Sequence, residues 1–269
     1  MHDKQTIRIL CVGDVIGEPG MQMFDKHIAS LKEKYLIDGV IVNGENSSKT
    51  GRGITPVIMQ KFKDLGVHVV KSGNHVWDNA QIMNYFSQHN DLLRPANYPS
   101  VCPGTGMTII PIDDIQVGVI NLQGRVFFKE ATDCPFRAAQ SLLTFLRTKT
   151  PIIVIDFHAE ASAEKAAMGL YLDGQVSAVV GTHMHVQTAD ERILPQGTAF
   201  ITDIGMVGAK NSIIGFKKEP TLGMMLTQMP HRFEVEPAGP FILNAVVITI
   251  DKASGHAHSI QRIALSDAN

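Results

Sequence analysis

Short apolar runs alternate with amphipathic segments through the first third of the chain. Runs rich in β-branched residues at 7–12, 39–43 and 68–72 predict strands, and the segments 19–35 and 55–65 between them predict helices. A strand–helix–strand rhythm is typical of a sheet covered by helices. We therefore expect an α/β fold.

The pattern changes after the third of these strands. Residues 107–122 predict a hairpin around Asp113 and Asp114, and alternation then resumes before a C-terminal third that is rich in strands. The further expected elements are helices at 135–147 and 161–171 and strands at 151–157, 177–181, 198–202, 232–235, 241–250 and 259–265. Parallel and antiparallel strands in this order predict two packed mixed sheets with helices outside, in a single domain spanning 1–269.

Composition narrows the class of protein. The 269 residues are 44% hydrophobic and 19% charged with a net charge of -2, so neither an extensive nucleic-acid-binding surface nor a polybasic membrane anchor is indicated. The longest apolar stretch, at 241–250, is too short to span a bilayer, and the N-terminus lacks the apolar core of a signal peptide. Cys11, Cys102 and Cys134 are odd in number and far apart, which predicts no disulfide framework. We expect a cytoplasmic protein.

Polar residues with metal-ligand chemistry follow five of the predicted strands, at the strand ends where open α/β sheets place their sites. They are Asp14, Glu45 with Asn46, Asn74 with His75, His158, and His183 with His185. Taken singly, each has an ordinary explanation as a helix cap, a turn residue or a core histidine. Together they indicate one site, and the glycines at 13, 44, 73 and 181 would allow close backbone approach beside it.

The stretch GTHMH at 181–185 presents two histidines one residue apart. In an extended chain, residues i and i+2 point to the same side, so His183 and His185 are expected to face one object. The eight polar groups at the strand ends are too many for one zinc ion with three protein ligands and an open position. They suit two metal ions, which predicts a hydrolase of phosphate esters.

The series GD (13–14), GEN (44–46), GNH (73–75), a lone His158 and GTHMH resembles the signature of the calcineurin-like metallophosphoesterase superfamily. Two departures narrow the resemblance: no histidine stands two residues after Asp14, and GEN replaces the usual GD. With NLQGR at 121–125, DFHAEA at 157–162 and THMHVQTAD at 182–190, these departures are similar to the YmdB-like branch. That branch implies a four-layered αββα fold, hydrolysis of cyclic-nucleotide phosphodiesters and assembly into a homo-oligomer.

The resemblance also implies a role for each ligand. Glu45 would bridge two ions; Asp14, Asn46 and His185 would complete the first metal site, and Asn74, His158 and His183 the second. Imidazole with carboxylate and amide oxygens favours iron or manganese, with zinc as an alternative. Ligating histidines usually need hydrogen-bond acceptors behind them. Candidate acceptors are Asp156, Glu160 and Asp203, which could equally be helix caps or surface residues.

His75 directly follows a ligand and suits the general acid that protonates the leaving oxygen, a role that the resemblance also gives it. The expected activity is attack of a metal-bridging hydroxide on small phosphodiesters, most of all 2',3'- or 3',5'-cyclic nucleotides. Arg125 is left open between a phosphate contact and a surface ion pair. Three alternatives remain: a phosphomonoesterase or protein phosphatase, a nuclease, and a non-catalytic metal-dependent nucleotide sensor.

Overall fold

The computed structural model describes residues 5–267. Its strands are β1 (Thr6–Val15), β2 (Gly39–Asn43), β3 (Val69–Lys71), β4 (Leu92–Leu93), β5 (Met107–Ile112), β6 (Ile115–Gln123), β7 (Ile153–His158), β8 (Ala178–Thr182), β9 (Arg192–Ile193), β10 (Ala199–Ile201), β11 (Met206–Ala209), β12 (Phe241–Asp251) and β13 (Ala257–Ser266). Its helices are α1 (Gly17–Tyr35), α2 (Pro56–Asp64), the short 3₁₀ helix η1 (Ala80–Ile82), α3 (Met83–Phe86), α4 (Pro135–Leu146), α5 (Ser162–Tyr171) and α6 (Lys218–Thr227).

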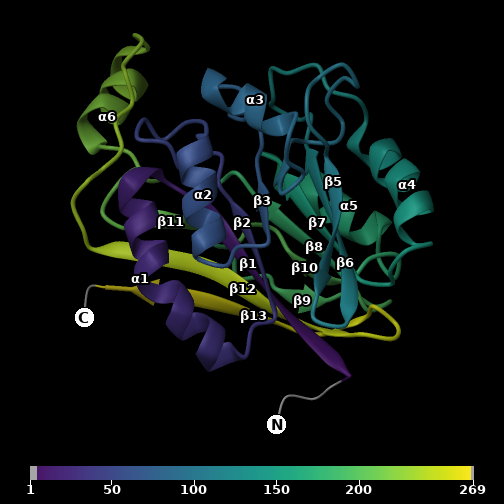
Figure 1. Ribbon diagram of the computed structural model, residues 1–269. Helices are drawn as coiled ribbons and strands as arrows, with labels where there is room; N and C mark the ends of the chain where they lie inside the picture. Colours follow the sequence, from purple (N-terminus) through teal and green to yellow (C-terminus); the bar gives the residue numbers. More distant parts are fainter. Residues whose placement is uncertain (1–4, 268–269) are drawn as a thin grey trace.

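The strands form two mixed sheets (Figure 1). One has the order β13-β12-β11-β1-β2-β3-β4, and the other has the order β5-β6-β7-β8-β10-β9. At the centre of the first sheet, β1 runs parallel to β2, while its other edge pairs antiparallel with β12 and parallel with β11. In the second sheet, β6, β7 and β8 are parallel. Parallel neighbours place their carboxyl ends at the same edge of each sheet.

Three apolar cores separate four layers of secondary structure. Leu10 and Val42 point to the face of the first sheet that α1 and α2 cover, where Phe24 and Phe62 pack. Between the sheets, alternate residues of the same strands meet side chains of β6 to β8. On the far face of the second sheet, the residues of β6 and β7 pack against α4 and α5. The predicted αββα architecture is therefore confirmed.

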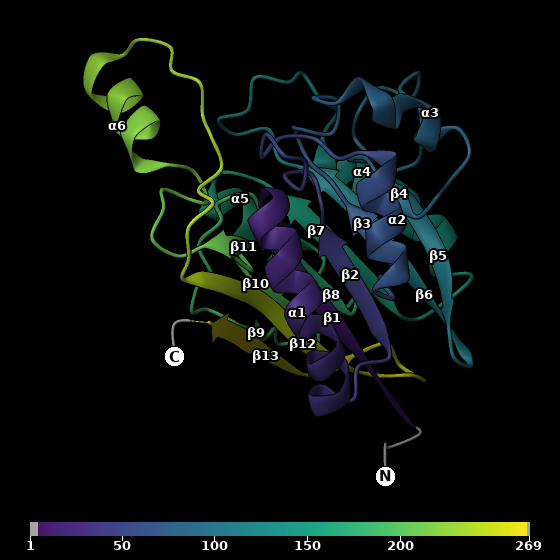
Figure 2. The same ribbon diagram turned by 60° about the vertical axis from the view of Figure 1, so that its left-hand side comes forward.

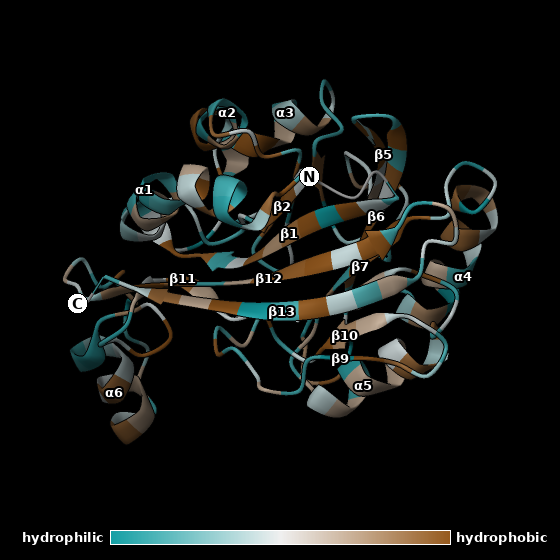
Figure 3. Ribbon diagram, turned by 90° about the horizontal axis from the view of Figure 1, so that it is seen from below, coloured by the Kyte–Doolittle hydropathy of each residue, from teal (hydrophilic) through white to brown (hydrophobic). Residues whose placement is uncertain are grey.

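Alternation of side chains explains this layering, because successive residues of a strand face opposite sides. In β1, Leu10 and Val12 belong to the core under the helices, whereas Ile9 and Cys11 belong to the core between the sheets. Both faces are buried, so the strands read as nearly continuous apolar runs. In Figure 3 such runs appear as brown stretches along β1 and β12.

Most of the expected elements are present with shifts of a few residues, including the β5–β6 hairpin, where Asp113 takes the left-handed turn conformation at φ 50°. The strand expected at 232–235 was wrong: in that stretch only Val235 pairs, in an isolated bridge with Phe216. The elements that the sequence did not predict are the short strands β4, β9 and β11 and the helices η1, α3 and α6. In Figure 2, α6 lies apart from both sheets at the end of a long connection.

None of the helices between residues 5 and 267 combines the length and the apolar character needed to cross a bilayer.

Candidate metal centre

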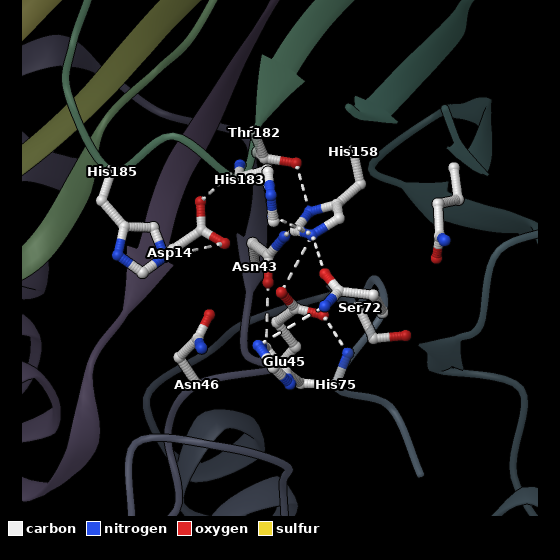
Figure 4. Close-up of polar contacts among 12 residues, drawn as sticks. Asp14, Asn43, Glu45, Asn46, Ser72, His75, His158, Thr182, His183 and His185 are labelled. Carbon is white, nitrogen blue, oxygen red and sulfur yellow. Dashed lines mark hydrogen bonds and ion pairs between the residues drawn. The ribbon is translucent and has the colours of Figure 1, made fainter. Parts of the chain in front are cut away.

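Both sheets deliver their polar strand ends to one place (Figure 4). From the first sheet, Asp14 lies near the end of β1, Glu45 and Asn46 follow β2, and Asn74 and His75 follow β3. From the second sheet, His158 ends β7, and His183 and His185 follow β8. The structure thus brings together all seven predicted ligands and the predicted acid. Asp14, Glu45, Asn46 and His158 are at most 2% exposed.

Glu45, Asn74, His158 and His183 form one half of the centre. His158 Nε2 lies 2.9 Å from Glu45 Oε1, 3.0 Å from Asn74 Oδ1 and 3.0 Å from His183 Nδ1. One ring nitrogen carries at most one proton and so satisfies at most one of these three neighbours. A convergence of carboxylate, amide and imidazole atoms around one point is typical of ligands arranged for a cation.

Asp14, Asn46 and His185 form the other half, on the left of Figure 4. His185 Nε2 lies 3.9 Å from Asp14 Oδ1. The Asn46 amide nitrogen donates to Gly51 O at 2.9 Å, which leaves Asn46 Oδ1 free to face the centre. This half contains two oxygen ligands and one imidazole, so it is richer in oxygen than a site built around a D-x-H motif.

Hydrogen bonds to the second ring nitrogen fix which nitrogen of each histidine faces the centre. His183 Nε2 pairs with Glu160 Oε2 at 2.9 Å, so Nδ1 faces inward. His185 Nδ1 donates to Ile214 O at 2.8 Å, so Nε2 faces Asp14. In both cases the inward nitrogen keeps a lone pair for a metal ion.

His158 is held by a chain of contacts that sequence reasoning found only in part. Its Nδ1 lies 3.0 Å from the Thr182 hydroxyl, which donates to Asp156 Oδ1 at 2.8 Å. The hydroxyl proton is thereby committed, so the imidazole donates from Nδ1 to Thr182 and directs Nε2 at the centre. Asp156 is in turn paired with Lys71, and both side chains are fully buried. Asp156 therefore acts on His158 through Thr182. The sequence does not indicate this role, because Thr182 looks like an ordinary residue of a buried strand.

The third candidate acceptor, Asp203, supports the loop rather than a ring. It accepts a hydrogen bond from the Met184 backbone N–H at 3.0 Å and pairs with the buried Lys165 at 2.8 Å. Arg125 does not line the cavity at this centre, as far as residues 5–267 show. Its backbone N–H donates to Glu164.

The expectation that His183 and His185 face one side of an extended chain was wrong. Both residues have positive φ, 101° and 62°, so the loop turns after β8 instead of continuing the strand. The His183 N–H donates to Asp14 Oδ2 at 3.2 Å and the Met184 N–H donates to Asp203, which holds the turn. Because of the turn, the two rings reach the two different halves of the centre.

Close backbone packing is required beside His158. A Cβ added to Gly73 would lie 2.1 Å from the His158 ring, so glycine is needed at this position. The same residue lets the turn after β3 bring Asn74 and His75 against the ring that ends β7.

His75 lies at the cavity wall and is oriented by two contacts. Its Nδ1 lies 2.9 Å from Asp78 Oδ2, and its backbone N–H donates to Glu45 Oε2 at 3.1 Å. The imidazole is 22% exposed, and its Nε2 lies 3.5 Å from the Asn74 amide nitrogen. A carboxylate on Nδ1 positions the ring and leaves Nε2 for proton exchange. The sequence pattern alone does not single out Asp78.

The charges of the centre are set by burial and by neighbouring groups. Burial raises the pKa of Asp14 to about 6, against the opposing effect of His185 and His158. For Glu45, burial also acts upward, but the charge of His158 and its contact, with smaller effects of His75 and His183, lower the pKa to about 2. Burial, followed by repulsion from His158, lowers the pKa of His183 to about 2. At neutral pH, Glu45 is ionised and His183 is neutral.

Buried oxygens without partners test whether these side chains fit a metal ion. Asp14 Oδ1, Asn46 Oδ1 and Glu45 Oε1 are buried and accept no hydrogen bond with good geometry. Leaving a buried polar atom unsatisfied costs about 1–3 kcal/mol, and more for a charged one. The ligand atoms of Glu45, His158 and His183 also lie within 4.8 Å of one another. The donor set therefore fits metal ions on both sides of the centre.

The centre opens into a cavity of about 400 Å³. One end is polar and carries Glu45, Asn46, His75, His183 and His185. The other end is lined by six apolar residues, which we call the apolar wall: Ile213, Ile214, Phe216, Met224, Met225 and Phe233. Arg52 lies among the remaining lining residues.

Comparison with known proteins places the chain in a family. The model of the YmdB-like protein family matches residues 10–263. The 2',3'-cyclic-nucleotide 2'-phosphodiesterase of Bacillus subtilis (strain 168) is 44% identical over 261 residues, which cover 97% of this chain and 98% of that protein. The matched family is the same YmdB-like branch that the sequence motifs resemble.

Two solved structures share the fold over nearly their whole lengths. A phosphatase of Mycoplasma pneumoniae superimposes with a TM-score of 0.91 at 31% identity, covering 97% of this chain and 94% of that one. A protein of Thermus thermophilus superimposes with a TM-score of 0.89 at 35% identity, covering 97% and 99%. With a family match over almost all of its length and these relatives beside it, the chain belongs to the YmdB-like protein family.

Proposed function

We propose that this protein is a phosphodiesterase that holds two metal ions and hydrolyses small phosphodiesters, with 2',3'- and 3',5'-cyclic nucleotides as the substrate class. The observation that carries the proposal is the pair of ligand groups on either side of Glu45, with partnerless buried oxygens in both. The Bacillus subtilis relative, whose name specifies a 2',3'-cyclic nucleotide, supports the choice of substrate.

In this proposal Asp14, Asn46 and His185 would hold one ion, Asn74, His158 and His183 would hold the other, and Glu45 would serve both. Bound metal ions supply activation of water and neutralisation of the phosphate charge. Iron or manganese suits the mixture of imidazole, carboxylate and amide ligands, and zinc is the alternative. The residues behind the ligands, Thr182 and Glu160, keep the imidazole lone pairs directed at the ions.

His75 protonates the leaving oxygen. Its Nδ1 is occupied by Asp78, so the proton that is transferred sits on Nε2, within the cavity that also contains Glu45. Protonation matters because the leaving group from a cyclic nucleotide is a sugar alkoxide, which departs poorly as an anion. The product is a phosphomonoester.

Three further proposals concern the whole chain. Residues 1–269 form one domain, because both sheets contribute ligands to one centre. The chain forms a homo-oligomer, which the exposure of Leu226 and Met229 on and just after α6, at 82% and 59%, supports. It works in the cytoplasm, in keeping with the unpaired Cys11, Cys102 and Cys134.

A substrate panel tests the proposed activity. The metal-loaded protein is assayed on cyclic nucleotides, a linear dinucleotide, a nucleoside monophosphate and a phosphopeptide. We expect the highest kcat/KM on a cyclic nucleotide. A preference for monoesters would establish a phosphatase, a preference for the linear dinucleotide would establish a nuclease, and tight binding without turnover would establish a sensor. Each of these results would overturn the proposal.

A further inference from the structure

The apolar wall has no task in the metal centre, although it lines the same cavity. A phosphate group and a ribose occupy only part of about 400 Å³, a volume within the range that binds small molecules of nucleotide size. The wall lines the same cavity as His183 and His185 and contains two phenylalanines and two methionines. Such surfaces bind flat, polarisable rings.

From this arrangement we infer that the apolar wall, together with Arg52, is the subsite for the nucleobase of the substrate. The inference rests on the proposed function and adds what it lacks, a means of recognising the part of the substrate that does not react. The phosphate would lie at the polar end of the cavity and the base at the apolar end.

The aromatic part of the wall is rigid. The rings of Phe216 and Phe233 lie 5.8 Å apart at 42°. Their segments are tied together by the Lys217 N–H, which donates to Glu234 O at 2.8 Å, and by the Glu236 N–H, which donates to Gly215 O at 3.0 Å. A rigid ring surface loses little conformational entropy when a base packs on it.

The loop that carries Asn46 also reaches the wall. Asn46 donates to Gly51 O, and Gly51, at φ 76°, lies so close to Phe216 that an added Cβ would be 2.7 Å from its ring. The same loop therefore sets the position of a predicted metal ligand and of an aromatic ring. This coupling links the two ends of the cavity through one loop.

Arg52, the next residue in the loop, supplies a polar contact at the apolar end. Its guanidinium carbon lies 5.6 Å from the centre of the Phe233 ring. Within residues 5–267 the hydrogen bonds at Arg52 all go to its backbone carbonyl, so the guanidinium donors are free. Nucleobases carry ring-nitrogen and carbonyl acceptors along their edges, and arginine is well suited to donate to two of them at once.

The helix α6 provides a matched pair of variants. Met225 and Leu226 are consecutive and both exposed, at 54% and 82%, but only Met225 is among the residues that line the cavity. Replacing either by alanine leaves the cores untouched. Phe233→Ala is a second test of the wall, and Arg52→Gln is a test of the polar contact, with Lys49→Gln as its control in the same loop.

The experiment compares two substrates that share the reacting group. One is adenosine 2',3'-cyclic phosphate, and the other is 1-O-methylribose 2,3-cyclic phosphate, which lacks a base. Stacking of one base on aromatic side chains is worth a factor of about 10 or more. We expect the protein to prefer the nucleotide by at least about 10-fold in kcat/KM, and Met225→Ala, Phe233→Ala and Arg52→Gln to reduce that preference.

The control variants Leu226→Ala and Lys49→Gln should keep the full preference. Equal kcat/KM on the two substrates in the unmodified protein would overturn the inference. Equal losses on both substrates in Arg52→Gln would place that residue at the phosphate and contradict its role here.

A binding measurement separates this inference from the proposed activity. Calorimetry measures the affinity of the metal-loaded protein for adenosine 3'-monophosphate and for inorganic phosphate. We expect tighter binding of the nucleotide, and loss of that advantage in Met225→Ala, even if no diester is turned over. If diesters are hydrolysed but the nucleotide binds no better than phosphate, the activity stands and the nucleobase subsite is refuted.

Discussion

The two ends of the cavity are built in different ways. The polar end is assembled from the ends of five strands, its carboxylates are almost fully buried, and hydrogen bonds fix its rings. The apolar end comes from one connection between β11 and β12, and all of its side chains except the buried Phe216 are partly exposed, with Ile214 at 45% and Met225 at 54%. Atoms that hold ions must be placed within fractions of an ångström, which a sheet provides. A surface for a flat ring needs less exact placement, so a connection held by a few backbone hydrogen bonds can supply it.

The largest expected effect is at Glu45, the residue assigned to both ions. Glu45→Ala should abolish measurable hydrolysis and reduce bound metal at both sites, because it removes an ionised carboxylate from between the two ligand groups. His158→Ala should reduce metal at one site only. Mass spectrometry measures the metal content per chain of both variants. Equal losses in the two variants would contradict the assignment of Glu45 to both ions.

At His75 we expect an effect on chemistry rather than on metal. His75→Gln should retain metal and slow hydrolysis of a cyclic nucleotide by about 10²–10⁴-fold, the usual cost of losing acid–base catalysis. On a nitrophenyl diester the loss should be far smaller, because nitrophenolate leaves without a proton. Steady-state rates on both substrates provide the measurement. Similar slowing on both would show that His75 only orients the phosphate.

Thr182 tests the support behind the polar end. Thr182→Val keeps the shape of a buried strand residue but removes the acceptor for His158 Nδ1–H. We expect metal affinity to fall by about 10–100-fold, as is usual when the acceptor behind a ligating histidine is lost. Thr182→Ser, which keeps the hydroxyl, should bind metal nearly as well as the unmodified protein. Competition with a metal indicator measures both, and an unchanged affinity in Thr182→Val would contradict this support.

Asp14 makes the polar end unfavourable without metal. The pKa of Asp14 is about 6 in the folded protein, above the ordinary value of 3.8. The contribution of this carboxyl to the free energy of unfolding is therefore fully present below pH 3.8, and it is lost as the pH rises through about 6. In chelator at pH 8, Asp14→Asn should therefore be about 3 kcal/mol more stable than the unmodified protein, with little difference at pH 4. Denaturant unfolding at both pH values measures this. A difference that does not depend on pH would contradict a buried, ionised Asp14.

The contrast between the two ends also explains what could be predicted. Asp14, Glu45 and His158 lie at or just beyond the ends of apolar runs, and strand order alone brings such positions together, so the polar end was foreseeable. The helix α6 was not, because Pro220 and Gly223 interrupt any amphipathic period there. Local propensity predicts a strand at Phe233, but the segment has no partner strand beside it except at Val235.

Other parts of the centre depend on contacts that no local pattern reveals. Thr182 looks like an ordinary strand residue until its hydroxyl is seen between His158 and Asp156. Likewise, the pairing of buried Lys71 with Asp156 joins the two sheets, and residues 85 positions apart cannot be matched from one sequence. The turn at His183 depends on Asp14 and Asp203, so an extended chain was the wrong starting point.

Metal content and position in one crystal test the central claim most directly. Crystals grown with manganese and measured by anomalous diffraction should contain two ions per chain, one among Asp14, Asn46 and His185 and the other among Asn74, His158 and His183, with Glu45 in contact with both. One ion in a fully loaded and fully active protein, or two ions with Glu45 touching only one of them, would contradict the account.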